Sequence, residues 1–154
     1  MGILPKCFGF SDSKQTTSSL YANKYSTQIE ELCHRFSLAQ LQKSSNFDGS
    51  QIIGRGDFGK VYKGCICIQG VAKEIALKRF ESNYSKVVSE FYTEIKLLCQ
   101  LGPPNLVSLI GFCSEKDQNI SVCEYMSNGS LADHLLGNRW EPLPWKRRIE
   151  ICIV

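Results

Sequence analysis

Apolar residues recur at helical spacing along one long segment of the chain. The spacing predicts a helix from about residue 85 to residue 101 with a single apolar stripe. Glu94 lies within this stripe, and a carboxylate on a buried face is costly unless it has a partner. The residues of the stripe are Val87, Val88, Phe91, Ile95, Leu98 and Leu101.

Strand-like patterns lie on both sides of this helix. Residues 61–68 and 74–80 are rich in β-formers, with a turn at Gln69-Gly70 between them, and residues 106–113 and 120–125 are apolar runs of strand length. Together with the strand that enters the first of these hairpins, they predict an α+β fold, a five-stranded antiparallel sheet with one main helix.

Shorter elements flank this core. Ser37-Leu38-Ala39-Gln40 has the form of a capping box and predicts a short helix to about Lys43. Ser130, with Asp133 three residues later, predicts another, and His134 on it is expected at the surface without a partner. We predict a flexible leader over 1–32, a short helix and the entry to the lobe over 33–52, and a lobe over 53–126. Over 127–154 we expect the first helices of a second, helical lobe that is incomplete in this sequence.

Composition excludes several classes of protein. At 154 residues the chain suits one domain or part of one, and a net charge of +3 is too small to indicate nucleic acid binding. No apolar run is long enough to span a bilayer. There are eight cysteines but no C-x-x-C pair, so we expect a reducing compartment, no zinc site and mostly core thiols. The thiols in apolar segments are Cys65, Cys67, Cys99, Cys113, Cys123 and Cys152.

The first residues leave two interpretations open. Gly2 is placed for myristoylation and Cys7 for palmitoylation, and two lipids would give stable membrane anchoring. Against this, Lys6 stands where the myristoylation motif has Ser or Thr, so an ordinary solvated start is the alternative.

A glycine-rich segment carries the chemistry. Gly54, Gly56 and Gly59 have the spacing of a loop whose backbone can lie close over phosphates. Dinucleotide-binding folds use the same spacing, but there a helix opens at the third glycine. Here a β-rich segment follows, which indicates a strand–turn–strand flap over a nucleotide.

Lys78 is the next candidate. Strand alternation places it with Ala76 and Phe80, opposite Ile75 and Leu77, so its ammonium could reach phosphate oxygens beside a space left by the alanine. A lone strand lysine is usually solvated. The inward Glu94 on the following helix changes that balance, because the two side chains would satisfy each other.

Taken in order, these motifs resemble the N-terminal lobe of a protein kinase, in particular of plant receptor-like and receptor-like cytoplasmic Ser/Thr kinases. The likeness runs from about Phe36 to the end of the chain. It rests on Phe36-Ser37-Leu38, Gly54-x-Gly56-x-x-Gly59-x-Val61, Ala76-Leu77-Lys78, Phe91-x-x-Glu94-Ile95, Asn105-Leu106-Val107-x-Leu109-x-Gly111-Phe112-Cys113, Glu124-Tyr125-Met126-x-Asn128-Gly129-Ser130-Leu131 and Trp145-x-x-Arg148.

The resemblance implies an ATP site. Lys78 would bind the α and β phosphates and be held by Glu94 as a structural ion pair. Ile53, Val61 and Ala76 would enclose the adenine, with Cys123 at the back of the pocket and backbone groups of Glu124 and Met126 at the hinge. The full set of implied nucleotide-binding residues is Ile53, Gly54, Arg55, Gly56, Asp57, Phe58, Gly59, Val61, Ala76, Lys78, Glu124 and Met126.

The residues for phosphoryl transfer are not found in this sequence. In the family, H-R-D-x-x-x-x-N and D-F-G supply the base and the Mg²⁺ ligands, from the C-terminal lobe. Asp57-Phe58-Gly59 spells the second motif but precedes Lys78, and His34-Arg35 lies upstream of everything. We therefore expect the N-terminal part of a truncated Ser/Thr kinase that binds ATP and is inactive as it stands, with no catalytic residue in this chain.

Two alternatives stay open. One is a genuine short pseudokinase-like interaction module without catalysis, and the other, a dinucleotide-binding oxidoreductase, would need a helix after Gly59. The kinase interpretation implies a protein substrate or signalling partner, no nucleic acid, and a cytoplasmic location, with peripheral attachment to the plasma membrane as an open alternative.

Overall fold

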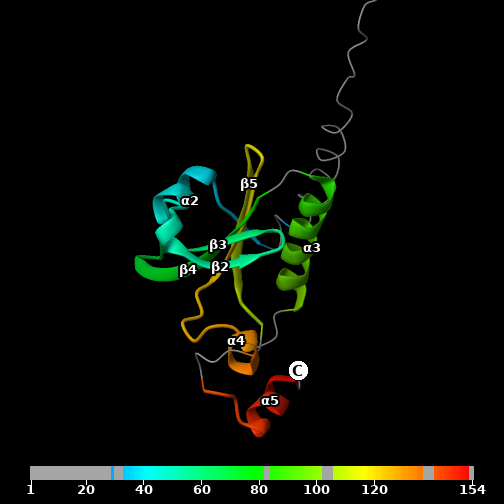
Figure 1. The fold of residues 1–154 in the computed structure, drawn as a ribbon. Helices are drawn as coiled ribbons and strands as arrows, with labels where there is room; N and C mark the ends of the chain where they lie inside the picture. The colour runs from blue at the N-terminus through cyan, green and yellow to red at the C-terminus, as the bar shows by residue number, and fades with distance from the viewer. Residues whose placement is uncertain (1–28, 30–32, 82–83, 102–105, 137–140, 153–154) are drawn as a thin grey trace, which may run out of the picture.

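Hydrogen bonding joins six strands into one sheet, and helices lie on both of its faces (Figure 1). The structure, a computed structural model, describes Ile29 and residues 33–81, 84–101, 106–136 and 141–152. The strands are β1 (His34–Arg35), β2 (Ile52–Gly56), β3 (Gly59–Ile68), β4 (Val71–Phe80), β5 (Leu109–Glu115) and β6 (Gln118–Glu124), in the spatial order β1-β5-β6-β4-β3-β2. The helices are α2 (Leu38–Ser44), the 3-10 turn η1 (Gly49–Gln51), α3 (Ser85–Leu101), α4 (Leu131–Leu136) and α5 (Trp145–Cys152).

The α+β fold is confirmed, and the sheet has one strand more than predicted. Strands β2 to β6 pair antiparallel, whereas β1 pairs parallel with β5 through His34 opposite Gly111 and Arg35 opposite Phe112. Both residues of β1 are exposed, so no apolar alternation marked this strand. Its position depends on pairing with a segment far along the chain.

Side-chain alternation along β4 divides the core between the two faces of the sheet. Ile75 and Leu77 are fully buried on the α2 face, and Phe80 is buried on the α3 face, as the alternation predicts. Figure 1 shows α2 and α3 on opposite sides of the sheet. The α2 face buries Phe36, Leu41, Tyr62, Ile75, Leu77, Cys113, Ile120 and Val122, and the α3 face buries Ile29, Phe80, Val88, Phe91, Tyr92, Ile95 and Phe112.

Local sequence signals account for the helices. Helix α3 has the predicted bounds, but Leu101 at its end is 58% exposed, and Tyr92, outside the predicted stripe, is buried. The capping box of α2 is present, because Ser37 Oγ accepts from the Gln40 N–H at 3.2 Å and Gln40 Oε1 accepts from the Ser37 N–H at 2.8 Å.

Ser130 and Asp133 form the equivalent contacts at the start of α4. His134 is half-buried rather than fully at the surface, and the prediction that it lacks a partner is wrong. Its Nε2 lies 2.8 Å from the Asn128 carbonyl oxygen. The imidazole therefore ties α4 to the turn before it.

One residue of the predicted leader belongs to the core. Ile29 is only 2% exposed and packs in the α3-face cluster, and its carbonyl oxygen accepts from the Cys33 N–H at 2.9 Å. The prediction of a flexible leader over 1–32 therefore does not hold at Ile29. Gly2, Cys7 and the rest of that range lie outside the described residues, and the division of the chain at residues 53 and 127 stays a prediction.

The cysteines are less buried than predicted. Cys113 and Cys123 are buried, Cys33 and Cys99 are half-buried, and Cys65, Cys67 and Cys152 are exposed. The two exposed thiols of β3 lie near its turn into β4, beyond the residues that pair with β2. The prediction of mostly core thiols is thus wrong for that end of β3 and for α5.

Gly111 lets β1 approach β5. A Cβ atom there would lie 2.3 Å from the His34 carbonyl oxygen and 2.6 Å from a ring carbon of Phe36. We expect Gly111→Ala to lower the free energy of unfolding by about 1–3 kcal/mol, the usual cost of overpacking. Urea unfolding would measure it, with Gly49→Ala as the control because a Cβ at Gly49 meets nothing within 4 Å. Equal stabilities of the two variants would contradict this account.

The buried thiols should resist alkylation. Burial raises the pKa of Cys113 to about 11 and, with the Glu94 carboxylate nearby, that of Cys123 to about 12. Because thiolate is the reacting species, iodoacetamide at about pH 8 should modify Cys65 and Cys67 well before these two. Peptide mapping by mass spectrometry measures the order, and denaturant should abolish it.

The raised pKa values of Cys113 and Cys123 also make the stability of the fold depend on pH. The ordinary thiol value is 9.0, so the unfolded state ionises first as pH rises. The contribution of these thiols to stability is complete below pH 9.0 and is lost progressively as pH rises toward about 11 and 12. Reaction of native Cys123 as fast as Cys65 would contradict both expectations.

Candidate functional site

The glycine loop, residues 54–59, is the connection between β2 and β3. Gly54 pairs with Val61, Arg55 with Lys60, and Gly56 with Gly59, so the hairpin turns at residues 57 and 58. A strand and not a helix follows the third glycine. This excludes the dinucleotide-binding alternative, which requires a helix there.

The three glycines of the loop have different surroundings. A Cβ added at Gly56 meets nothing within 4 Å, and one at Gly54 meets only Val61 at 3.7 Å, an ordinary contact. A Cβ at Gly59 would lie 2.0 Å from the carbonyl oxygen of Arg79. Gly59 is therefore required by packing against β4, whereas the absence of side chains at Gly54 and Gly56 leaves open space at the loop.

Strand register gathers the remaining predicted residues on one face of the sheet. Val61 lies directly opposite Lys78, and Ala76 lies directly opposite Cys123. Opposed residues of antiparallel strands share a face, and so do residues two apart on one strand. The register is shifted between Ile52 and Gly54, with Ile53 as the extra residue, 44% exposed at the edge of this face.

An ion pair joins this face of the sheet to α3. The Nζ of Lys78 donates to Oε2 of Glu94, and both side chains are 29% exposed. Ser121 Oγ donates to the other carboxylate oxygen of Glu94 at 3.3 Å, and the Lys78 Nζ lies 4.8 Å from the centre of the Phe80 ring. The ammonium is thus held by Glu94 of α3 and lies near Phe80 of β4, while Ser121 of β6 fixes the carboxylate and the pair stays accessible from solvent.

Cys123 closes the inner end of the same face. It is 9% exposed and opposes Ala76 in the register. The Glu94 carboxylate raises its pKa and the Lys78 ammonium lowers it, after the larger effect of burial, so the thiol lies within the electrostatic range of the ion pair. The neutral thiol adds a small apolar surface next to Ala76.

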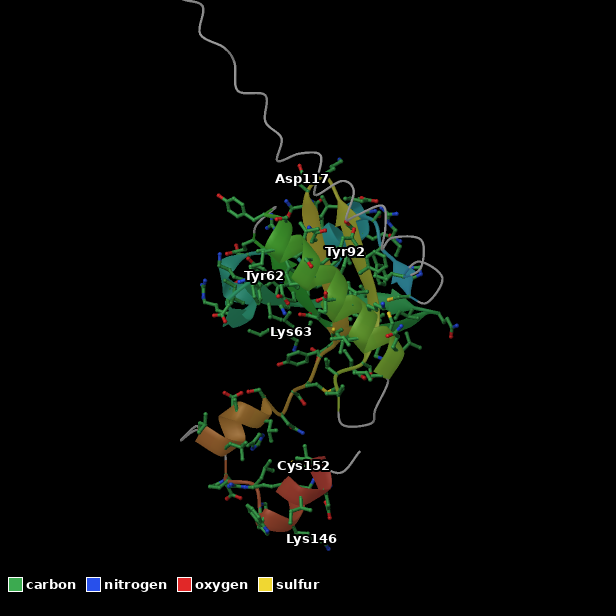
Figure 2. The ribbon with its side chains drawn as sticks, turned by 90° about the vertical axis from the view of Figure 1, so that its right-hand side faces the viewer. Tyr62, Lys63, Tyr92, Asp117, Lys146 and Cys152 are labelled. Carbon is green, nitrogen blue, oxygen red and sulfur yellow. The ribbon has the colours of Figure 1, made fainter. Side chains whose placement is uncertain are left out.

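Contacts from the β3–β4 hairpin and from Ser108 hold residues 124 and 125, at the end of β6. Lys73 Nζ lies 3.5 Å from Glu124 Oε1, and the Glu124 N–H donates to the Ser108 carbonyl at 3.0 Å. Lys63, in the centre of Figure 2, pairs with Glu74, and its Nζ lies 4.3 Å from the centre of the Tyr125 ring. The hydrogen bond to Glu74 raises the pKa of Lys63.

These contacts fix the backbone through residue 125. Met126 follows and is 48% exposed. The part of the chain predicted as a hinge is therefore anchored on its strand side.

Sequence reasoning missed Ser121 and the position of Phe58. Ser121 is 1% exposed within the apolar run of residues 120–123, and its place in the alternation, two residues before Cys123 on the α3 face, was the available signal. Phe58, at the turn of the glycine loop, packs on the α3-face cluster, and its carbonyl accepts from the Glu81 N–H at 3.1 Å. No local pattern indicated that contact.

The two misleading motifs have structural roles of their own. Asp57-Phe58-Gly59 forms the turn and start of β3, with Asp57 exposed, and His34-Arg35 is strand β1. Arg55 is also exposed on the loop. Neither segment brings a carboxylate to the ion pair.

Comparison of the sequence with known protein families identifies the class of protein. The sequence profile of the protein tyrosine and serine/threonine kinase family matches residues 47–153. That match covers more than half of the chain and includes the glycine loop, Lys78 and Glu94. The chain belongs to this kinase family.

Its curated relatives are plant receptor-like kinases. It is 39% identical over 155 residues to the receptor-like protein kinase FERONIA of Arabidopsis thaliana, covering 99% of this chain and 17% of that protein. It is 46% identical over 123 residues to ANXUR2 and 46% identical over 138 residues to a probable receptor-like protein kinase, both of the same plant, covering 14% and 15% of their lengths. The chain thus spans less than a fifth of these relatives. None of the helices in the described ranges has the length and apolar character to cross a membrane.

The glycine loop yields a test that separates packing from ligand binding. We expect Gly59→Ala to destabilise the fold by about 1–3 kcal/mol, because its methyl group collides with the Arg79 carbonyl. Gly56→Ala should leave the unfolding midpoint nearly unchanged, since its surroundings are empty. Thermal unfolding of both variants measures the difference, and a Gly59→Ala protein as stable as Gly56→Ala would overturn the assignment.

Proposed function

We propose that this chain is the ATP-binding portion of a protein Ser/Thr kinase, which transfers a phosphoryl group from ATP to protein Ser/Thr hydroxyls. The observation that supports it is the partly exposed Lys78–Glu94 pair, on the same sheet face as Val61 and beside the open glycines. Such a cation, fixed by a helix carboxylate, is suited to bind the α and β phosphates.

The residues present fit the nucleotide. Gly54 and Gly56 leave room for phosphates to approach backbone N–H groups, and Ile53, Val61 and Ala76 offer apolar surface to an adenine. Backbone groups of Glu124 and Met126 are the proposed hydrogen-bond partners of the base. Bound ATP would supply the γ-phosphoryl group, and Mg²⁺ is expected for a full kinase.

We propose further that these 154 residues bind nucleotide without transferring phosphate. The sequence holds no H-R-D-x-x-x-x-N motif, and its single D-F-G lies in the β2–β3 turn. A non-catalytic interaction module is the second candidate, favoured by exposed apolar side chains such as Leu136 (87%) and Trp145 (72%). A cytoplasmic location, with peripheral membrane attachment if Gly2 and Cys7 are lipidated, is part of the proposal.

A thermal-shift titration with ATP tests nucleotide binding. We expect ATP to raise the unfolding temperature of the chain, since a ligand that binds only the native state stabilises it. Lys78→Ala should lose roughly 1.5–3 kcal/mol of ATP binding energy, the range for hydrogen bonds to charged groups. Lys96→Ala is the matched control, because Lys96 is an exposed lysine on the same helix as Glu94.

Each shift is measured against the same variant without ATP, so that any change in stability is separated from binding. Glu94→Gln, which removes the charge and keeps the shape, should weaken ATP binding less than Lys78→Ala. An ATP shift that survives in Lys78→Ala would contradict the proposed site. A radiolabelled ATP assay showing robust transfer by the isolated chain would contradict the proposal that it binds without catalysis.

A further inference from the structure

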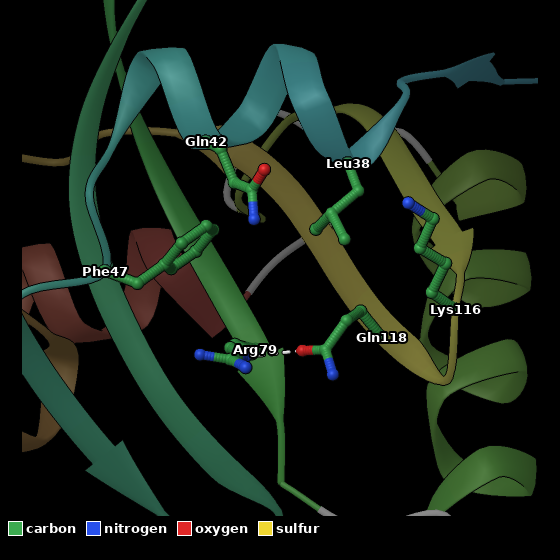
Figure 3. A pocket seen from close by; sticks show the side chains of 6 residues that line it. All are labelled: Leu38, Gln42, Phe47, Arg79, Lys116 and Gln118. Carbon is green, nitrogen blue, oxygen red and sulfur yellow. Dashed lines mark hydrogen bonds between the residues drawn. The ribbon is translucent and has the colours of Figure 1, made fainter.

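A cavity lies on the opposite face of the sheet from the Lys78–Glu94 pair. It has a volume of about 240 Å³ and lies between α2, β4 and the β5–β6 turn (Figure 3). Arg79 follows Lys78 on β4, so the two cations point to opposite faces. The cavity is lined by Leu38, Gln42, Phe47, Arg79, Lys116 and Gln118.

Arg79 is held in place within this cavity. Its Nε donates to Gln118 Oε1 at 2.7 Å, and its guanidinium carbon lies 5.4 Å from the centre of the Phe47 ring. Phe47 has a φ of 51°, a left-handed conformation that is rare for a bulky residue. Its ring also contacts Tyr62 edge-on at 5.2 Å between centroids. The backbone thus bears strain at the residue that supports the arginine.

Lys116 brings a second cation from the β5–β6 turn. Figure 3 shows the amide of Gln42 directed into the cavity, toward Phe47 and Arg79, whereas the Lys116 side chain runs along the opposite wall with its ammonium toward the start of α2. Lys116 has an acidic residue on each side in the sequence: one carboxylate oxygen of Glu115 accepts from the Leu38 N–H at 2.9 Å, and Asp117 is exposed on the turn. Among the salt bridges between described residues, none includes Arg79 or Lys116.

The lining of the cavity indicates the chemistry of a ligand. Two cations and two amide side chains line the cavity as donors, which suits an anion with several oxygen acceptors. The volume is below the ~300–1,000 Å³ of pockets for drug-sized ligands, so it suits one charged group and its immediate neighbour. Leu38 and Phe47 add an apolar wall that inorganic phosphate alone would not use.

We propose that this cavity, the Arg79–Lys116 pocket, binds a phosphorylated serine or threonine of a peptide segment. The phosphate contacts Lys116 and the guanidinium of Arg79, and an apolar side chain beside it packs on Leu38 and Phe47. The exposed positions of Gln42 and Lys116 leave the rim open for the peptide to continue over the surface. The proposal is independent of nucleotide binding on the other face.

An NMR titration of the full chain tests it. The probe is a short peptide with one phosphoserine between two leucines, compared with the unphosphorylated peptide, the same peptide with aspartate, and inorganic phosphate. We expect amide signals of residues around Leu38, Phe47 and Gln118 to shift with the phosphopeptide at lower concentration than with the other three probes. Equal affinity for inorganic phosphate would show a simple anion site and overturn the peptide assignment.

Two variants and a control establish the location. Lys116→Asn removes the cation with a residue that tolerates the φ of 50° found there. Gln42→Glu places a carboxylate on the rim at an exposed helix position. Each should weaken phosphopeptide binding by about tenfold or more, as expected for loss or opposition of a charge-assisted contact. Lys43→Gln, the same loss of charge one residue along α2, should leave binding unchanged.

Each result of these binding measurements either supports or contradicts phosphopeptide binding at the Arg79–Lys116 pocket. Loss of binding in Lys116→Asn and Gln42→Glu, with binding kept in Lys43→Gln, supports the pocket. Equal weakening in all three variants would indicate attraction to net charge alone, and no shift with the phosphopeptide in the folded chain would reject the site. The ATP thermal shift should be unchanged in both pocket variants, which separates a failure here from a failure of the nucleotide site.

Discussion

The fold and the site both depend on the contact between Lys78 and Glu94. These two residues lie on different elements, and each would be a poorly solvated charge if the other were absent. Their pairing fixes how α3 sits over the sheet, because the carboxylate is also bound by Ser121 of β6. An ammonium placed in this way has a defined position before any ligand arrives, which lowers the cost of binding a phosphate.

Strand β4 serves three surfaces through one alternation. Its inward residues on the α2 face complete one core, and its residues on the α3 face supply Lys78 of the proposed nucleotide site and Phe80 of the second core. Arg79, on the α2 face like Ile75 and Leu77, lines the cavity beneath α2. Because successive side chains point to opposite faces, a one-residue shift of register would lose all three at once.

Local sequence patterns predicted most elements of the fold. The bounds of α3, both capping boxes and the faces of β4 could be predicted because each is decided by residues within one or two turns or strands of it. Strand β5 begins at Leu109, three residues later than its apolar run, because pairing with β6 decides where it starts. Strand β1 and the burial of Ile29 could not be predicted, since their partners are far along the chain.

The geometry of the candidate site was predictable in part. Motif order selected the glycine loop, Lys78 and Glu94, and strand alternation placed Ala76 on the same face as Lys78. The contacts that hold these residues were less visible, because Ser121 is a single polar residue in an apolar run and Phe58 is held by a backbone hydrogen bond to Glu81. The exposure at one end of β3 was missed because Cys65 and Cys67 are apolar in type but lie beyond the residues of β3 that pair with β2.

The parallel pairing of β1 with β5 has a consequence for the order of folding. Arg35 and Ser114, joined by a hydrogen bond across this edge, are 79 residues apart in the chain. The antiparallel hairpins β2–β3, β3–β4 and β5–β6 close short loops, whereas docking β1 requires the entropy of one very long loop. Its surface for docking, with Gly111 at the centre, exists only after β5 has joined β6. We therefore expect the β1 edge of the sheet to be the last part to assemble and the first to open.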